Sequence, residues 1–212
     1  MINVGGVKVA RLLPNRLVTT QGKPGSRTLY LTFDDGPDPK YTIPVCDMLQ
    51  RLGVKATFFC IGDNLEKYPD IARYAASGGH LLANHSMHHR SFRKLSLAEQ
   101  LREAEDCQKL IFSIAGDTRR IFRAPQGQLS IPLLVSLKQR HWDIVHWSAD
   151  SLDYRQMPLS EQLAVFEERP VVDGDILLFH DDSQLAIDIL ERMLPRWLAE
   201  GYRFSTVLDL VT

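Results

Sequence analysis

The sequence of 212 residues lacks the features that mark several large classes of protein. It contains no apolar run close to the roughly 18 residues that a membrane-spanning helix needs, so no membrane span is expected. It has no excess of positive charge, since 25 Lys and Arg residues stand against 26 Asp and Glu. A chain of such balanced charge has no electrostatic basis for binding nucleic acid. Residues 1–6 lack the basic segment and apolar stretch of a secretory signal, so we expect a cytoplasmic location, or secretion if the chain is truncated.

Cysteine is also scarce. Cys46, Cys60 and Cys107 are an odd number, lie far apart and form no CxxC pair. This pattern argues against a disulfide framework or a zinc knuckle and indicates small buried side chains in a reducing compartment. Histidine, in contrast, is concentrated, because four of the seven histidines lie between His80 and His89. We expect the chemistry of the protein at this cluster.

Apolar blocks rich in β-branched and aromatic residues alternate with segments of helical spacing. About seven strands are expected, at residues 28–33, 56–61, 80–84, 120–123, 143–147, 175–180 and 202–207. Helices are expected at residues 42–52, 69–77, 97–115, 130–140, 159–168 and 189–200. This alternation predicts a single α/β domain with a parallel sheet, either an irregular barrel or a doubly wound sheet. Residues 1–27 show no clear period and are expected to form an irregular or short-strand lead-in.

Polar side chains gather where the predicted strands end. They are Asp34, Asp35, His85, His89, Arg123, Asp150, Asp153 and His180. In parallel α/β folds the carboxyl ends of the strands converge on one crevice, where ligands bind. The sequence therefore predicts one polar site at this edge of the sheet.

Two of these histidines have the spacing of metal ligands. His85 and His89 are four residues apart, so one turn of helix or a helix-like loop would bring both imidazoles to one face. Asp35 is the candidate for a third ligand, because catalytic zinc sites combine three nitrogen or oxygen ligands with an open position. Read separately, the histidines also fit a polar loop, and Asp34-Asp-Gly-Pro37 fits a simple turn. A glycosidase pair is disfavoured, because adjacent carboxylates cannot easily flank a bond about 5 to 9 Å apart.

Taken together in order, these segments resemble the five motifs of the polysaccharide deacetylases with a NodB-homology domain, carbohydrate esterase family 4. The matching segments are Thr32-Phe-Asp-Asp-Gly36, His85-Ser-Met-His-His89, Arg123-Ala-Pro-Gln-Gly127, Asp150-Ser-Leu-Asp-Tyr154 and Leu178-Phe-His180. The resemblance covers about residues 28–208. It implies a distorted (β/α) barrel of about seven parallel strands, with residues 28–212 as the NodB-homology deacetylase domain.

The resemblance also implies a metal-dependent reaction. Asp35, His85 and His89 would hold a divalent metal, zinc in the first place, with cobalt, nickel or manganese as alternatives. Such a metal polarises a carbonyl and lowers the pKa of bound water toward about 7. Asp34 would be the general base, and Arg123 would hold that carboxylate in its charged form.

The remaining roles follow from the same resemblance. His180 would be the general acid toward the departing amine, oriented and kept protonated by Asp153. The residues expected to contact substrate are Pro125, Gln126, Tyr154 and Leu178. The backbone N–H of Gln126 would donate to the oxyanion, while Tyr154 and Leu178 would line the acetyl pocket and groove. The family usually has an aromatic residue in place of Gln126 and Trp in place of Tyr154, which puts the sugar specificity in question more than the hydrolysis.

The predicted activity is the removal of N-acetyl groups from amino sugars of the GlcNAc type in an oligosaccharide or polysaccharide. The apparent lack of a signal favours an intracellular precursor or oligosaccharide over a cross-linked cell wall. One alternative is a deformylase or deacylase of a lipid-linked amino sugar. Another is an inactive carbohydrate-binding module, which predicts that a catalytic group is missing, and none is. The oligomeric state is left open.

Two weaker features allow more than one interpretation. Trp147 suits either stacking on a sugar or packing in the core. Arg90, Arg93 and Lys94 are expected in a solvated loop, with an anionic substrate group as the alternative partner. His80 is assigned an ordinary packing role.

Overall fold

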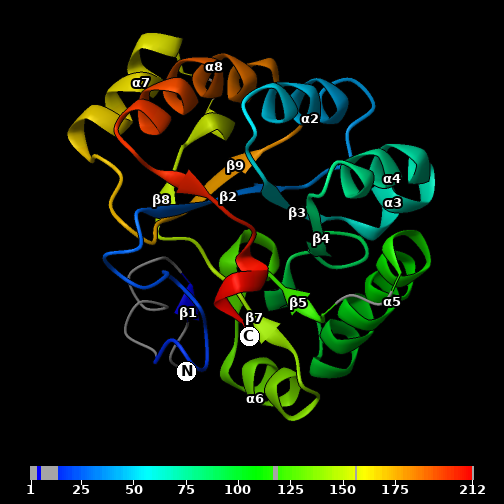
Figure 1. The fold of residues 1–212 in the computed structure, drawn as a ribbon. Coiled ribbons are helices and arrows are strands. Elements are labelled where there is room, and N and C mark those ends of the chain that lie inside the picture. The colour runs from blue at the N-terminus through cyan, green and yellow to red at the C-terminus, as the bar shows by residue number, and fades with distance from the viewer. Residues whose placement is uncertain (1–3, 6–13, 117–118, 156, 212) are drawn as a thin grey trace.

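The structure is a computed structural model that describes residues 4–5, 14–116, 119–155 and 157–211. Its centre is a curled parallel sheet with helices around the outside (Figure 1). The strands are β2 (Thr28–Asp34), β3 (Ala56–Cys60), β4 (Leu81–Asn84), β5 (Ile121–Phe122), β7 (Asp143–Ile144), β8 (Ala149–Asp150), β9 (Ile176–His180) and β10 (Arg203–Phe204). Their order is β7-β5-β4-β3-β2-β9-β8, and β10 pairs with the start of β2. The predicted α/β class and distorted barrel are confirmed.

The sheet curls but does not close into a complete barrel. It has two edges, formed by β7 and β8. The strand predicted over residues 143–147 is present only at its start, as β7, and ends after Ile144. Beyond β7 the chain turns to the N-terminal segment, where the N–H of His146 donates to the carbonyl of Thr19 at 2.8 Å. Ser148 then joins the opposite edge by donating its N–H to Ile176 O at 3.0 Å. Residues 145–148 therefore span the opening of the half-barrel.

The helices alternate with the strands as predicted. They are α2 (Thr42–Arg51), α3 (Gly62–Lys67), α4 (Pro69–Ser77), α5 (Leu97–Ala115), α6 (Ile131–Gln139), α7 (Leu159–Glu168) and α8 (Gln184–Ala199). The predicted capping box begins α5, since Ser96 and Glu99 each accept the other's backbone N–H. The short helix α3 is not predicted by the sequence, because six residues hold too few apolar positions to show a helical period.

The core has a layer between the sheet and the surrounding helices and a smaller layer inside the barrel. Phe33 and Phe58 stack at a ring distance of 4.9 Å in the outer layer. Burying side chains of this size stabilises the fold by roughly 1.5 to 3 kcal/mol each. All three cysteines are buried and free, as predicted, and Cys60 and Cys107 lie near each other through the bond from Cys107 Sγ to Cys60 O.

The N-terminal lead-in lies against the sheet where it is described. Strand β1 (Val4–Gly5) pairs antiparallel with β6 (Gln128–Leu129). Gly22 donates its N–H to Gly174 O at 2.8 Å, and a Cβ on Gly174 would lie 2.6 Å from Gly22 O. This close approach explains the glycine at position 174. Residues 1–3 and 6–13 of the predicted lead-in fall outside the described residues.

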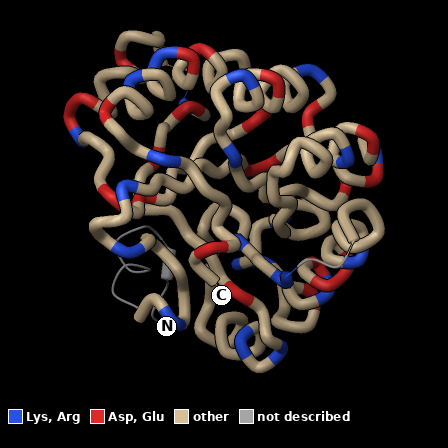
Figure 2. The backbone as a smooth tube through the Cα atoms, viewed as in Figure 1, with Lys and Arg blue, Asp and Glu red and all other residues tan. Residues whose placement is uncertain are grey.

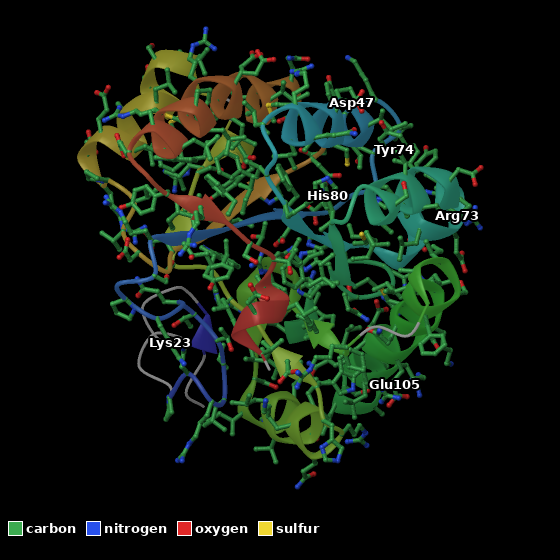
Figure 3. The ribbon with its side chains drawn as sticks, viewed as in Figure 1. Lys23, Asp47, Arg73, Tyr74, His80 and Glu105 are labelled. Carbon is green, nitrogen blue, oxygen red and sulfur yellow. The ribbon has the colours of Figure 1, made fainter. Side chains whose placement is uncertain are left out.

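Basic and acidic residues are intermixed along the backbone, as the balanced composition implies (Figure 2). Within the described residues, no helix has both the length and the apolar character to cross a bilayer. Figure 3 shows Tyr74 of α4 directed toward Asp47 of α2, and the Tyr74 hydroxyl donates to the Asp47 carboxylate at 2.5 Å. His80 is 6% exposed and packs edge-on against Phe58, which confirms its packing role.

Candidate active site

A cavity of about 350 Å³ opens at the carboxyl ends of β2, β8 and β9. It is lined by Asp34, Asp35, His85, His89, Gln126, Trp147, Asp150, Tyr154, Leu178 and His180. Eight of these ten are residues to which the sequence assigns a role in catalysis, metal binding or substrate binding. Arg123 and Asp153 are buried behind this wall, each bonded to a residue that lines it. The structure thus brings the predicted residues together from separate strand ends.

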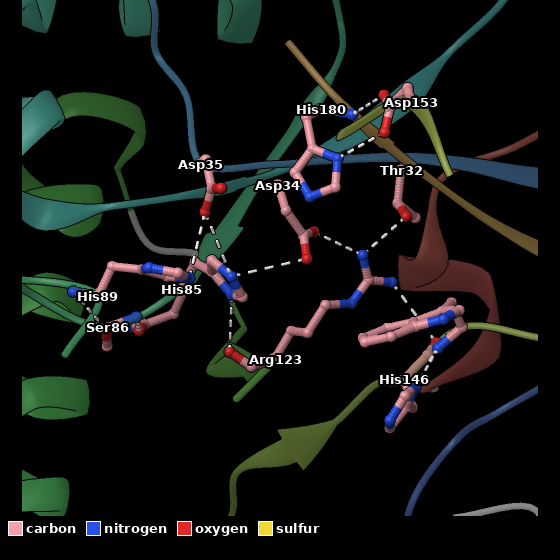
Figure 4. Close-up of polar contacts among 12 residues, drawn as sticks. Thr32, Asp34, Asp35, His85, Ser86, His89, Arg123, His146, Asp153 and His180 are labelled. Atoms are coloured by element: carbon pink, nitrogen blue, oxygen red, sulfur yellow. Dashed lines mark hydrogen bonds and ion pairs between the residues drawn. The ribbon is translucent and has the colours of Figure 1, made fainter. Parts of the chain in front are cut away.

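Asp35, His85 and His89 form a three-residue cluster within the cavity (Figure 4). One ligand atom from each lies within 4.8 Å of the others. The Oδ1 atom of Asp35 is 3.5 Å from His85 Nε2 and 3.4 Å from His89 Nε2. Among the described residues this oxygen is buried without a hydrogen-bond donor. Two nitrogens and a carboxylate oxygen converge on one space, which is the donor set of a catalytic zinc site.

The loop that carries the histidines is not the helical turn that the spacing suggests. Ser86 and His89 have φ values of 71° and 50°, in the left-handed region that non-glycine residues rarely adopt. Local hydrogen bonds stabilise this path, because Ser86 N donates to Asn84 Oδ1 at 2.9 Å and His89 N donates to Ser86 Oγ at 3.1 Å. The two imidazole rings still meet, with their centroids 5.0 Å apart.

The charge states of the cluster suit a cation. Nδ1 of His85 lies 2.9 Å from the carbonyl oxygen of Arg123, so Nδ1 carries the proton and Nε2 keeps a free lone pair. Burial lowers the pKa of both His85 and His89, which keeps the imidazoles neutral. Burial, with the charge of Asp34, raises the pKa of Asp35. A bound divalent cation would offset that cost and satisfy the orphaned oxygen, so these residues fit the predicted metal.

Asp34 lies beside the cluster and is paired with Arg123. Nη1 of Arg123 is 2.6 Å from Asp34 Oδ1 and also donates to Thr32 Oγ1 at 2.8 Å. The guanidinium lies over the ring of Phe59, 3.9 Å from its centroid. Burial alone would raise the pKa of Asp34, but the charge of Arg123, together with that of His180, lowers it. Asp34 is therefore a carboxylate at neutral pH, with Oδ2 turned toward His85.

His180 stands on another side of the cavity and is held by Asp153. Its Nδ1 is 2.8 Å from Asp153 Oδ1, and its backbone N–H donates to Asp153 Oδ2 at 2.7 Å. Burial alone would lower the pKa of His180, but the bond and charge of Asp153, with the charges of Asp34 and Asp35, raise it to about 10. The site therefore places a protonated imidazole and an ionised carboxylate in one cavity.

The predicted substrate residues occupy different positions. Leu178 is buried in the cavity wall, and Tyr154 is 53% exposed with its ring edge-on to His180. Gln126 has φ 53°, and its side chain accepts a hydrogen bond from Gln128 Nε2 at 2.6 Å. Pro125 is buried and does not line the cavity.

Three further residues contribute to the site although the sequence gives them no settled role in catalysis, metal binding or substrate binding. Trp147 and Asp150 line the cavity, and Thr32 accepts from the guanidinium of Arg123. The structure places Trp147 in the cavity wall, one of the two positions that the sequence allows. Asp150 follows a predicted strand, and Thr32 begins the first motif. The sequence therefore indicates that both lie near the site, but not what either does there.

Comparisons with known proteins agree with this geometry. The family model for polysaccharide deacetylases matches residues 21–142. The chain belongs to the polysaccharide deacetylase family. Two proteins of Bacillus cereus, both named peptidoglycan-N-acetylglucosamine deacetylase, are similar to it. One is 31% identical over 94% of this chain and 95% of its own length, and the other is 30% identical over 84% and 66%.

A solved structure shares the fold of this polysaccharide deacetylase. It is the Bc1960 peptidoglycan N-acetylglucosamine deacetylase in complex with 4-naphthalen-1-yl-N-oxidanyl-benzamide. The TM-score is 0.87 at 27% identity, over 91% of this chain and 92% of that one. This likeness covers more of the chain than residues 21–142, which the family model matches.

Proposed function

We propose that this chain is a metal-dependent deacetylase that hydrolyses the N-acetyl groups of amino sugars of the GlcNAc type in a glycan. The observation that carries the proposal is the buried, donor-free Oδ1 of Asp35 facing two neutral imidazoles, beside the ionised Asp34 and the protonated His180. The family and the names of its relatives support an amino-sugar substrate, with peptidoglycan as the polymer.

An acetamide is a poor electrophile with a poor leaving group. Its hydrolysis therefore requires a polarised carbonyl, an activated water and a protonated leaving amine. Asp35, His85 and His89 would hold a divalent cation, which would supply Lewis-acid polarisation of the acetyl carbonyl and acidify water. Asp34 takes the proton of the attacking water on Oδ2, because Arg123 occupies Oδ1.

His180 completes the reaction at the leaving group. Its Nδ1 is bonded to Asp153, which leaves Nε2 to deliver a proton to the departing amine nitrogen. The backbone N–H of Gln126 serves as a donor to the oxyanion that forms on the acetyl oxygen. Removing a single donor of this kind commonly costs about a hundredfold or more in kcat.

The cavity wall suits an uncharged sugar. Trp147 and Tyr154 offer aromatic surface, and Asp150 offers a carboxylate that can accept from sugar hydroxyls. Lys and Arg are absent from the lining, as far as the described part of the chain shows. The N-hydroxyamide in the Bc1960 complex is a metal-chelating group, so the same compound is a suitable inhibitor to try on this chain.

Product analysis on a panel of substrates tests the proposal. Metal-replete protein is incubated with N-acetylated chitooligosaccharides, peptidoglycan fragments and lipid-linked sugars, while acetate and formate are measured. We expect acetate release that Asp34→Asn abolishes and that chelation stops until metal is restored. Formate from a lipid-linked sugar would indicate a deformylase instead. Binding without any turnover would indicate an inactive carbohydrate-binding module.

A further inference from the structure

Glu103, on α5, is a buried carboxylate that lies outside the cavity, and its side chain is 2% exposed. Burial alone would raise the pKa of Glu103, but hydrogen bonds from His88 and Arg90 lower it, so the group is ionised. Burying a charge is costly unless it is well paired, and an apolar residue would pack between a helix and a loop at lower cost. The residues that bind this carboxylate therefore indicate its structural role.

Those partners flank His89 on both sides. Glu103 Oε2 accepts from the backbone N–H of His88 at 2.8 Å, and Oε1 lies 2.9 Å from His88 Nδ1. Oε1 also accepts from Arg90 Nε at 2.9 Å, and Arg90 Nη2 donates to the same oxygen. Arg90 lies in an exposed loop as expected, with its side chain 54% exposed, and its guanidinium is paired with Glu103.

The preceding part of the loop is held from another helix. The N–H of Gly62 donates to Ser86 O at 3.0 Å and that of Asp63 donates to Met87 O at 2.8 Å, both from the first residues of α3. Beyond Met87, Glu103 holds both His88 and Arg90 by hydrogen bonds, and His88 Nε2 also lies 3.8 Å from Asp63 Oδ1 of α3. Between these two residues, His89 adopts its left-handed conformation.

From this arrangement we infer that Glu103 is a positioning residue for the metal site. By fixing His88 and Arg90, it holds the backbone of His89 in a conformation of high energy and aims the imidazole at Asp35. The inference rests on the proposed metal site. It predicts that a change at Glu103 weakens metal binding although Glu103 contacts neither the ligands nor the cavity.

The test compares the affinity for Zn²⁺ of the full chain and of Glu103→Gln. The amide keeps an acceptor for the N–H of His88 but replaces the charge that pairs with Arg90. We expect the Kd for Zn²⁺, measured by competition with a chromophoric chelator, to rise about tenfold, as for other residues that orient metal ligands. Asp106→Asn is the matched control, because Asp106 is on the same helix and, among the described residues, its carboxylate is bonded only to Lys109.

Circular dichroism of the metal-free proteins shows that each variant is folded at the temperature of the titration. Should Glu103→Gln fail to fold, Arg90→Gln replaces it, because the Arg90 side chain is 54% exposed and its loss leaves Glu103 bonded to His88. A folded variant with the wild-type Kd would overturn the inference and leave the proposed function intact. Failure of the wild-type chain to bind Zn²⁺ would overturn the proposed function itself.

Discussion

Arg123 and Asp34 form a buried ion pair in which Nη1 and Oδ1 are 2.6 Å apart, with the side chains 1% and 4% exposed. The pair joins the end of β2 to the residue that follows β5. Because both charges are removed from water, each depends on the other. The pair therefore links the stability of the fold to the charge state of the proposed base.

Arg123→Ala should destabilise the protein by about 3 to 5 kcal/mol, because it leaves the Asp34 carboxylate buried without its partner. Urea unfolding measures this loss. In any folded fraction, the acid limb of kcat/KM should move to higher pH, since Arg123 lowers the pKa of Asp34. Arg119→Ala is the control, because Arg119 is in a half-exposed pair with Asp143, and it should change stability by no more than about 1 kcal/mol.

Asp34→Asn should retain the metal but lose nearly all of kcat, because the amide cannot take a proton from water. It should also lower stability, because it leaves the Arg123 guanidinium buried without its charged partner. General-base catalysis typically contributes about a hundred- to ten-thousandfold, which sets the scale of the loss. Steady-state kinetics with an N-acetylated chitooligosaccharide measures it. Asp38→Asn serves as a comparison, because Asp38 caps the turn before α2 and is outside the cavity. Near-normal kcat in Asp34→Asn would remove Asp34 from the role of base.

The pH above which activity falls should be set by the pKa of His180. A general acid must be protonated, so activity falls as pH rises through its pKa, which is about 10 in this site. Asp153→Asn removes the main influence that raises this pKa and leaves the burial that lowers it. The limb should then move down by about 1 to 3 pH units. An unchanged limb in Asp153→Asn, with Asp188→Asn on α8 as control, would mean that another group sets it.

Asp181 should make the fold less stable as pH rises. It is fully buried, Thr42 donates to its Oδ2, and its burial raises the pKa from 3.8 to about 7. Between these values the unfolded chain ionises while the folded chain stays protonated, so stability falls from pH 4 to pH 7 and then levels off. Asp181→Asn should remove this decline, on the order of 4 kcal/mol. Urea unfolding of the metal-free protein at several pH values measures it, and parallel curves for both forms would contradict the expectation.

The sequence allows the fold class and the main site residues to be predicted because both depend on local signals. Strands end in polar residues, and parallel strands bring those ends together, so Asp34, His85 and His180 could be placed at one site. The cluster geometry agrees with that placement, while the catalytic roles remain predictions.

Other features depend on contacts between distant segments. The predicted strand 143–147 ends early, after Ile144, because His146 bonds to Thr19, a contact that no local pattern contains. Nothing in the sequence around Glu103 distinguishes it from other helical glutamates, because its role depends on the contact with the loop at His88. The left-handed conformation of His89 likewise replaces the helical turn that the spacing alone suggests.

The central claim is that Asp35, His85 and His89 hold one divalent cation. The most direct measurement is the metal content of the purified chain, of His85→Ala and of Asp34→Asn after loading with Zn²⁺ and removal of the excess. We predict one ion per chain in the wild type and in Asp34→Asn, and none in His85→Ala. An equal content in His85→Ala, or its loss only in Asp34→Asn, would contradict the assignment of ligand and base.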